Sequence, residues 1–168
     1  MESRARAFGH PIHPMLIVFP LGLLAISVIF DILYYITGNV GLATAAFWNI
    51  IAGIVLGLVA AVFGLWDWLA IPADTRAKRI GLLHGGGNVV VVALFFISWL
   101  LRLGTVDHRP NGFGFALQVI AVILALFTAW LGGELVDRLG VGVSRDANLN
   151  APSSLSTGPE HSMPVHTP

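Results

Sequence analysis

Four long apolar stretches alternate with short polar breaks along the chain, at residues 15–37, 42–69, 80–101 and 112–136. Each stretch reaches the roughly 20 residues that a helix needs to cross a bilayer. The breaks between them carry the Gly, Pro, Asn and Asp residues that are typical of turns. Links this short place successive helices antiparallel, so the pattern predicts an all-α, integral membrane four-helix bundle of up-down-up-down topology.

The composition indicates a chain whose surface is solvated partly by lipid. The chain is 56% hydrophobic and 11% charged, whereas a soluble domain carries about 25% charged residues. Three regions follow: an N-terminal segment at 1–13, the transmembrane domain at 14–140, and a tail at 141–168. The tail is rich in Ser, Pro, Asn and Thr and lacks an apolar period, which predicts disorder.

Charge and cysteine content exclude several classes of function. The formal net charge is zero, so no clustered basic face predicts nucleic-acid binding. The chain has no cysteine, which removes disulfides, thiolate metal sites and thiol redox chemistry. Redox chemistry would therefore need a bound cofactor, and no hydrolase arrangement or phosphate loop is visible. Whether the chain is an enzyme stays open.

Lys and Arg residues predict the orientation, because they are enriched in cytoplasmic loops. One side of the membrane receives two of them, and the other receives seven. Both termini are therefore expected in the cytoplasm, with the chain in the cell (inner) membrane as a multi-pass protein. The seven residues are Arg4, Arg6, Arg76, Lys78, Arg79, Arg138 and Arg145, and the two are Arg102 and Arg109.

Ionisable side chains within a membrane are costly and mark functional hypotheses. The predicted depths bring five of them, from all four helices, into one layer near the cytoplasmic face: His10, His13, Asp67, His84 and Glu134. A second polar layer, near the outer face, contains Asp31, Asn49, Ser98 and Gln118. Spans 1 and 3 are diagonal in an up-down bundle, so His13 and His84 should face each other, with Asn88 on the face of His84.

Two cofactors fit this layer. A haem b would take His13 and His84 as axial ligands, with Asn88 beside it, and a flat group would explain the three glycines 85–87 within a span. A non-haem iron, zinc or manganese ion would use His13, His84 and Asp67, with His10 or Glu134 as further ligands. The alternative is structural: carboxylates near Arg76, Arg79 and Arg138 form interfacial ion pairs, and small residues pack helices.

Several motifs resemble one family of bacterial four-helix membrane proteins, catalogued as a domain of unknown function. They are the His-Pro-Ile-His-Pro run at 10–14, Gly-Leu-Trp-Asp at 64–67, His-Gly-Gly-Gly-Asn at 84–88, Gly-Gly-Glu-Leu-Val at 132–136 and Gly-Val-Gly-Val at 140–143. Some relatives are fused to a Rieske iron–sulfur domain, so the resemblance implies a membrane redox role with a Rieske-type partner. It also implies that His10, His13, Asp67, His84, Asn88 and Glu134 belong together.

Three functions are compatible with these features. The first is haem or metal binding near the cytoplasmic face, in electron transfer. The second is a structural or assembly subunit whose buried polar groups specify packing, and the third is a small transporter or proton pathway. Four spans without an inverted repeat of broken helices disfavour transport. The expected partners are the lipid bilayer and a membrane redox protein, and a homo-oligomer stays open.

Overall fold

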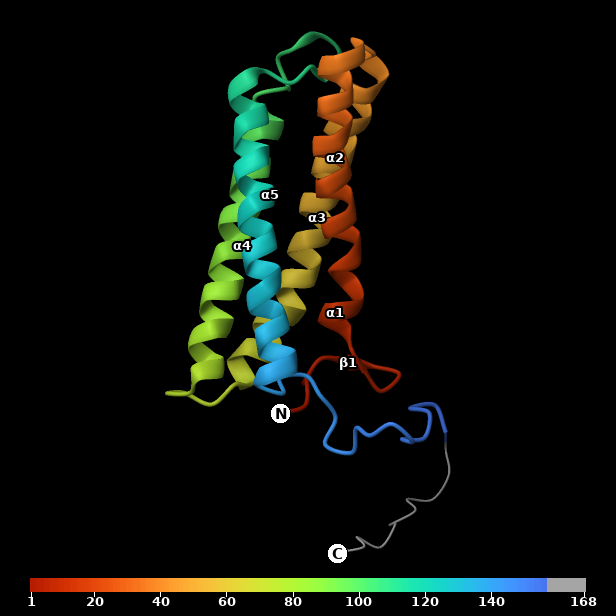
Figure 1. Ribbon diagram of the computed structural model, residues 1–168, viewed down its shortest axis with the longest axis vertical. Coiled ribbons are helices and arrows are strands. Elements are labelled where there is room, and N and C mark those ends of the chain that lie inside the picture. The colour runs from red at the N-terminus through yellow and green to blue at the C-terminus, as the bar shows by residue number, and fades with distance from the viewer. Residues whose placement is uncertain (157–168) are drawn as a thin grey trace, which may run out of the picture.

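The structure, a computed structural model, describes residues 1–156. Four spans form one elongated bundle (Figure 1). The first is made of α1 (Ile12–Leu16) and α2 (Val18–Thr37), and the others are α3 (Val40–Ala70), α4 (Arg76–Leu100) and α5 (Gly112–Gly133). All four are long and apolar enough to cross a membrane, which confirms the predicted fold class. We call the end near the N-terminus the proximal end and the opposite end the distal end.

Local sequence signals set the helix boundaries. Gly38 takes a left-handed conformation with φ of 70° and ends α2, because glycine adopts positive φ without steric cost. Three side chains cap the starts of the next helices. Asn39 accepts from the N–H of Gly41, Thr75 from that of Lys78, and Asn111 from that of Gly114. Each satisfies a backbone donor that the first helical turn leaves unpaired.

Two spans depart from a continuous α-helix. The first is interrupted at Ile17, three residues before Pro20. Pro20 has no backbone N–H group to donate to the preceding helical turn. The fourth continues beyond α5 as the π-helix η2 (Glu134–Arg138), in which the N–H of Leu139 donates to the carbonyl of Glu134. A short 3₁₀ turn, η1 (Val106–His108), lies in the distal loop between α4 and α5.

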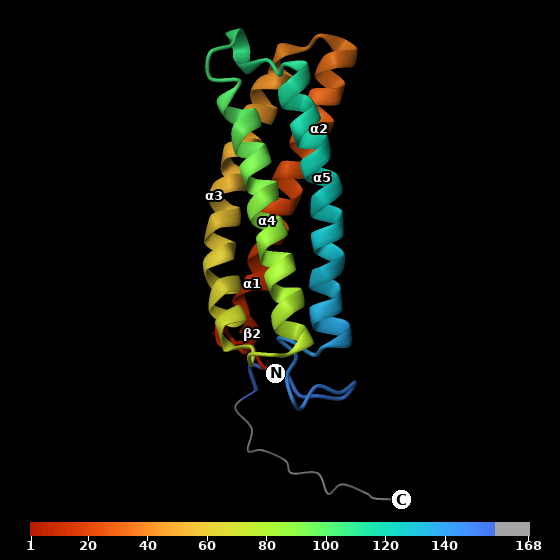
Figure 2. The same ribbon diagram turned by 90° about the vertical axis from the view of Figure 1, so that its left-hand side faces the viewer.

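The apolar core lies in the middle and distal parts of the bundle. Antiparallel neighbours α2 and α3 pack together, as do α4 and α5, and α3 also packs on α4 (Figure 2). The buried cluster contains Leu24, Val28, Ile50, Ile54, Val91, Phe95 and Ala121. Most other large apolar side chains point outwards, as expected for a surface solvated by lipid.

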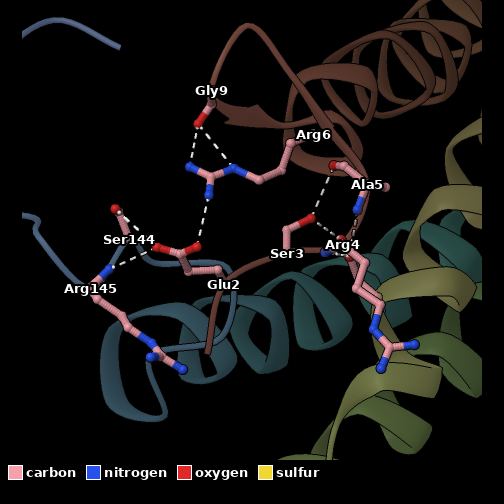
Figure 3. A network of polar contacts seen from close by, with 9 residues as sticks. Glu2, Ser3, Arg4, Ala5, Arg6, Gly9, Ser144 and Arg145 are labelled. Carbon is pink, nitrogen blue, oxygen red and sulfur yellow. Dashed lines mark hydrogen bonds and ion pairs between the residues drawn. The ribbon is translucent and has the colours of Figure 1, made fainter. Parts of the chain in front are cut away.

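The N-terminal segment folds back beneath the proximal end. A hairpin pairs β1 (Arg6–Ala7) with β2 (His10–Pro11). Glu2 joins this segment to the chain after η2, because its carboxylate accepts from the N–H of Arg145 at 3.1 Å and from Arg6 at 3.0 Å (Figure 3). The N–H bond from Arg145 and the Arg6 charge hold the pKa of Glu2 below its usual range.

The part of the predicted tail that the structure describes, residues 141–156, runs as turns and irregular chain without helix or strand. The remainder of that predicted tail, residues 157–168, lies outside the described residues.

Candidate cofactor site

His13 is held by α1 against α3. Its Nδ1–H donates to the carbonyl of Ala60 at 2.8 Å, and a carbonyl can only accept, so this bond assigns the proton to Nδ1. Gly64 lies one turn further along α3. A Cβ atom at position 64 would lie 2.9 Å from Cε1 of His13, so any side chain there would require the ring to shift.

His84 is held in the same way by the opposite pair of helices. Its Nδ1–H donates to the carbonyl of Thr128 on α5, also at 2.8 Å. Gly132 follows Thr128 by one turn, and a Cβ atom there would lie 3.1 Å from Cε1 of His84. Each histidine therefore has a backbone carbonyl as acceptor and a glycine four residues further along the same helix to make space for the imidazole.

The two rings face each other inside the bundle. Their centroids lie 6.4 Å apart and their planes are almost perpendicular, at 86°. Because both Nδ1 atoms are engaged as donors, the neutral rings keep the lone pair on Nε2. The sequence predicts these two residues opposite each other, and in the structure they lie together. Their role as ligands stays a prediction.

Asn88 supports His84 rather than reaching across the bundle. Its Nδ2 donates to the carbonyl of His84 at 2.9 Å and lies 3.4 Å from Nε2 of the same residue. Its Oδ1 accepts from the hydroxyl of Thr128 at 3.0 Å. Thr128 thus orients both Asn88, through its side chain, and His84, through its carbonyl.

The other three predicted site residues lie away from the histidine pair. The carboxylate of Asp67 accepts from the hydroxyl of Ser3 at 2.6 Å and from two backbone N–H groups of the N-terminal segment, those of Arg4 and Ala5. It therefore anchors that segment beneath the bundle. Figure 3 shows Ser3, Arg4 and Ala5 of this segment.

Glu134 and His10 also have partners outside the pair. Glu134 forms an ion pair with Arg76 at 2.6 Å, as the interfacial interpretation expected. His10 is exposed, and its Nε2 lies 3.2 Å from the hydroxyl of Ser154. Among residues 1–156, no three His, Asp or Glu side chains are close enough to hold a metal ion together. The structure therefore does not bring the five predicted metal ligands together.

The three consecutive glycines of α4, at positions 85–87, have different surroundings. A Cβ atom at position 87 would lie 2.5 Å from Cγ2 of Thr128, so Gly87 allows α4 and α5 to pack closely. Gly85 and Gly86 have no neighbouring atom of the described chain within 4 Å of the corresponding position. Close helix packing therefore explains one of the three glycines.

The second polar layer also contains Arg102, which the sequence predicts in the loop after span 3. Arg102 donates to both carboxylate oxygens of Asp31, and both side chains are almost fully buried. Beside them, Nε2 of Gln118 donates to the hydroxyl of Ser98 at 2.8 Å. Asn49, also predicted in this layer, is half-buried. A lone carboxylate within a span was the signal that a buried cation had to lie nearby.

Taken together, four apolar spans around two facing histidines define a multi-pass helical membrane protein with a polar site inside the bundle. The chain belongs to the family described as predicted membrane protein (DUF2231), whose model matches residues 9–145. The match covers all four spans and both histidines of the pair. No match was found among curated proteins or among solved structures.

Proposed function

We propose that the chain binds haem b between His13 and His84 and serves in electron transfer within the membrane. The observation that carries this proposal is the distance and angle between the two imidazoles. Metal–imidazole bonds of about 2 Å on opposite sides of one ion separate two ring centroids by roughly 6 Å. The observed separation is 6.4 Å, which is compatible with one ion between the two rings.

The hydrogen bonds of the two rings support the same proposal. A histidine that binds a metal commonly donates its other ring N–H to a carbonyl or carboxylate, which fixes the ring and makes the ligating nitrogen more basic. Ala60 and Thr128 supply such carbonyls. Asn88 and Thr128 then hold His84 in place from the side. Helical bundles commonly build cofactor sites in this way, from side chains of facing helices.

A bound haem would supply one-electron chemistry. The residues of this chain would set the environment in which it occurs: two imidazole ligands and the apolar cluster towards the distal end. Burial and hydrogen bonds to the ligands are the means by which a protein adjusts a haem potential. A membrane redox partner of the Rieske type belongs to the proposal as the protein that would exchange electrons with this site.

A non-haem iron, zinc or manganese site is the second candidate, and the geometry favours it less. It needs a carboxylate beside the histidines, whereas Asp67 and Glu134 are engaged by the N-terminal segment and by Arg76. A packing role for the histidines is the alternative without cofactor, since a ring bonded to a backbone carbonyl is also a satisfied buried side chain.

The test is purification in mild detergent, without chelator or polyhistidine tag, followed by elemental analysis and a visible spectrum. We expect about one iron per chain with the absorption of a six-coordinate, bis-histidine haem. His13→Ala and His84→Ala should each lose that spectrum, whereas His10→Ala, which removes an exposed histidine outside the pair, should keep it. The proposal fails if the chain binds no haem after reconstitution with hemin, or if H13A and H84A bind it as the unchanged chain does.

We also propose that the proximal end is cytoplasmic and that the membrane is the bacterial inner membrane. Arg102 is neutralised by Asp31 inside the bundle, which leaves Arg109 as the exposed cation of the distal end, against seven at the proximal end. The charge asymmetry that sets topology is therefore strong. The chain has no cysteine, so an impermeant maleimide should label Gly104→Cys but not Ala73→Cys in intact spheroplasts. The reverse pattern would refute this orientation.

A further inference from the structure

The helix that carries His13 has little packing of its own. α1 consists of 5 residues, none of which is buried, and the interruption at Ile17 separates it from α2. A helix this short is not stable in isolation. The bond from the His13 ring to the carbonyl of Ala60 is one tie between α1 and α3. The position of His13 therefore depends on whatever else holds α1 in place.

The N-terminal segment supplies a second tie to α1. The N–H of Ile12, the residue before His13, donates to the carbonyl of Ala5 at 2.9 Å. Ala5 is buried, and its own N–H donates to Oδ1 of Asp67 on α3 at 3.2 Å. A short chain of hydrogen bonds and covalent links thus leads from the Asp67 carboxylate to His13.

Asp67 binds the N-terminal segment with both of its carboxylate oxygens. Oδ1 also accepts from the N–H of Arg4 at 2.7 Å, and Oδ2 accepts from the hydroxyl of the buried Ser3 at 2.6 Å. Hydrogen bonds to a charged acceptor are about twice as strong as those between neutral groups. The Asp67 carboxylate is therefore the main anchor of the segment on the bundle.

The other side of the segment is tied to the chain that follows η2. The carbonyl of Met1 accepts from the N–H of Gly142 at 2.7 Å, and the carboxylate of Glu2 accepts from the N–H of Arg145 (Figure 3). The segment thus runs beneath the proximal end from the chain after η2 to α1, with the bonds to Asp67 between these two attachments.

His84 is held without any contribution from this segment. It lies within the 25 residues of α4, its Nδ1–H donates to the carbonyl of Thr128 on α5, and Asn88 of α4 donates to its carbonyl. All of these partners belong to two long helices of the bundle. The two histidines of the pair therefore differ in what keeps them in position.

We propose that Asp67 is a positioning residue for His13, which it holds opposite His84 through the N-terminal segment. The inference deepens the proposed function and rests on it where haem ligation is concerned. Loss of the carboxylate leaves two backbone N–H groups and one hydroxyl without their acceptor. The segment then releases Ile12 and with it His13, whereas His84 keeps its partners.

Three variants test this role. Asp67→Ala removes the acceptor altogether. Asp67→Asn keeps one side-chain oxygen that can accept from the N–H groups of Arg4 and Ala5, so it should restore part of the contact. Asp137→Ala is the matched control, because Asp137 is an exposed carboxylate of η2 at the same end of the bundle and takes no part in these contacts.

The first measurement uses the chain without haem. NMR of the isotopically labelled protein in detergent gives the hydrogen-exchange protection of the Ile12 amide and of the Nδ1–H groups of His13 and His84. We expect Asp67→Ala to lower the protection of Ile12 and His13 at least about tenfold, as the loss of a buried acceptor does. Asp67→Asn should lower it less, and Asp137→Ala should leave it unchanged. His84 should stay protected in all three variants.

The second measurement is the visible spectrum after addition of hemin. Asp67→Ala should bind hemin through His84 and show a larger five-coordinate fraction than the unchanged chain, as His13→Ala does. Asp67→Asn should fall between them, and Asp137→Ala should keep the six-coordinate spectrum. A merely structural role for Asp67 would weaken the whole bundle and would expose His13 and His84 equally.

Unchanged protection of Ile12 and His13 in Asp67→Ala would overturn the inference, and so would equal losses at His13 and His84 or equal effects of Asp67→Ala and Asp137→Ala. If Asp67→Ala does not fold, the comparison of Asp67→Asn with the unchanged chain decides in the same way. Failure of the unchanged chain to bind hemin would refute the proposed function, while the exchange measurement would still decide whether Asp67 positions His13.

Discussion

Replacing Asp31 with asparagine should be one of the most destabilising single changes in this chain. Arg102 is 1% exposed and donates to both carboxylate oxygens of Asp31, and its Nε has no partner among residues 1–156. An asparagine keeps the shape of the side chain and removes the charge. The guanidinium would then remain buried without a counterion.

The magnitude follows from the burial of the pair. Removing one partner of a buried ion pair costs about 3–5 kcal/mol, because the remaining charge is left uncompensated. Asp107→Asn provides a matched control, since Asp107 forms its ion pair with Arg109 in the same distal loop region with both side chains nearly half exposed. An exposed pair of this kind contributes about 0–1 kcal/mol. We therefore expect the two asparagine variants to differ by at least about 2 kcal/mol.

The assay is equilibrium unfolding in mixed micelles of dodecylmaltoside and dodecyl sulfate, followed by circular dichroism. A double variant, Asp31→Leu with Arg102→Met, removes both charges and should recover most of the loss, as apolar replacements of buried pairs do. The reasoning is refuted if D31N is as stable as D107N. It is also refuted if the double variant is no more stable than D31N, because the loss would then come from packing rather than from an unpaired charge.

Two further changes test contacts at the proximal half. Because the pKa of Glu2 is lowered in the folded chain, its contribution is present at neutral pH and is lost as the pH falls through the folded-state pKa. Glu2→Gln should therefore lower the protection factor of the Arg145 amide against hydrogen exchange at pH 7. Acidification should lower that protection factor, corrected for the intrinsic pH dependence of exchange, in the unchanged chain but not in the variant. Unaltered exchange in the variant would contradict this role. Gly87→Val should lower the free energy of unfolding by about 1–3 kcal/mol through overpacking against Thr128, whereas Gly86→Val, in open surroundings, should be milder; equal losses would show that helix propensity dominates.

The helices and their order were predictable because the signals for them are local. Apolar length identifies each span, and the turn residues between spans fix where the helices stop. The second span was predicted at 42–69 and runs from Val40 to Ala70, and the first was predicted to end at residue 37, where α2 ends. The opposition of His13 and His84 was predictable as well, since depth and helix face together determine which residues of diagonal spans meet.

The carboxylates show what depth alone does not determine. Asp67 and Glu134 lie at the proximal end, as their positions in the sequence predicted, yet their partners are the N-terminal segment and Arg76. The bonds to Asp67 include two from backbone N–H groups, and every residue except proline has such a group, so no side-chain pattern reveals them. Arg102 was assigned to a loop because it follows the apolar run of span 3, although its long side chain reaches back to Asp31.

The two halves of the bundle have different interiors, and this difference bears on function. The distal half holds the apolar cluster and the Asp31–Arg102 pair, which joins α2 to the end of α4 across the bundle. The proximal half has glycines, an alanine and the two histidines along its inner seams. Binding sites tend to lie in the less stable parts of a protein, because a site must admit its ligand. The distal half can therefore hold the helices in register, whereas the proximal half carries the two histidines inside the bundle.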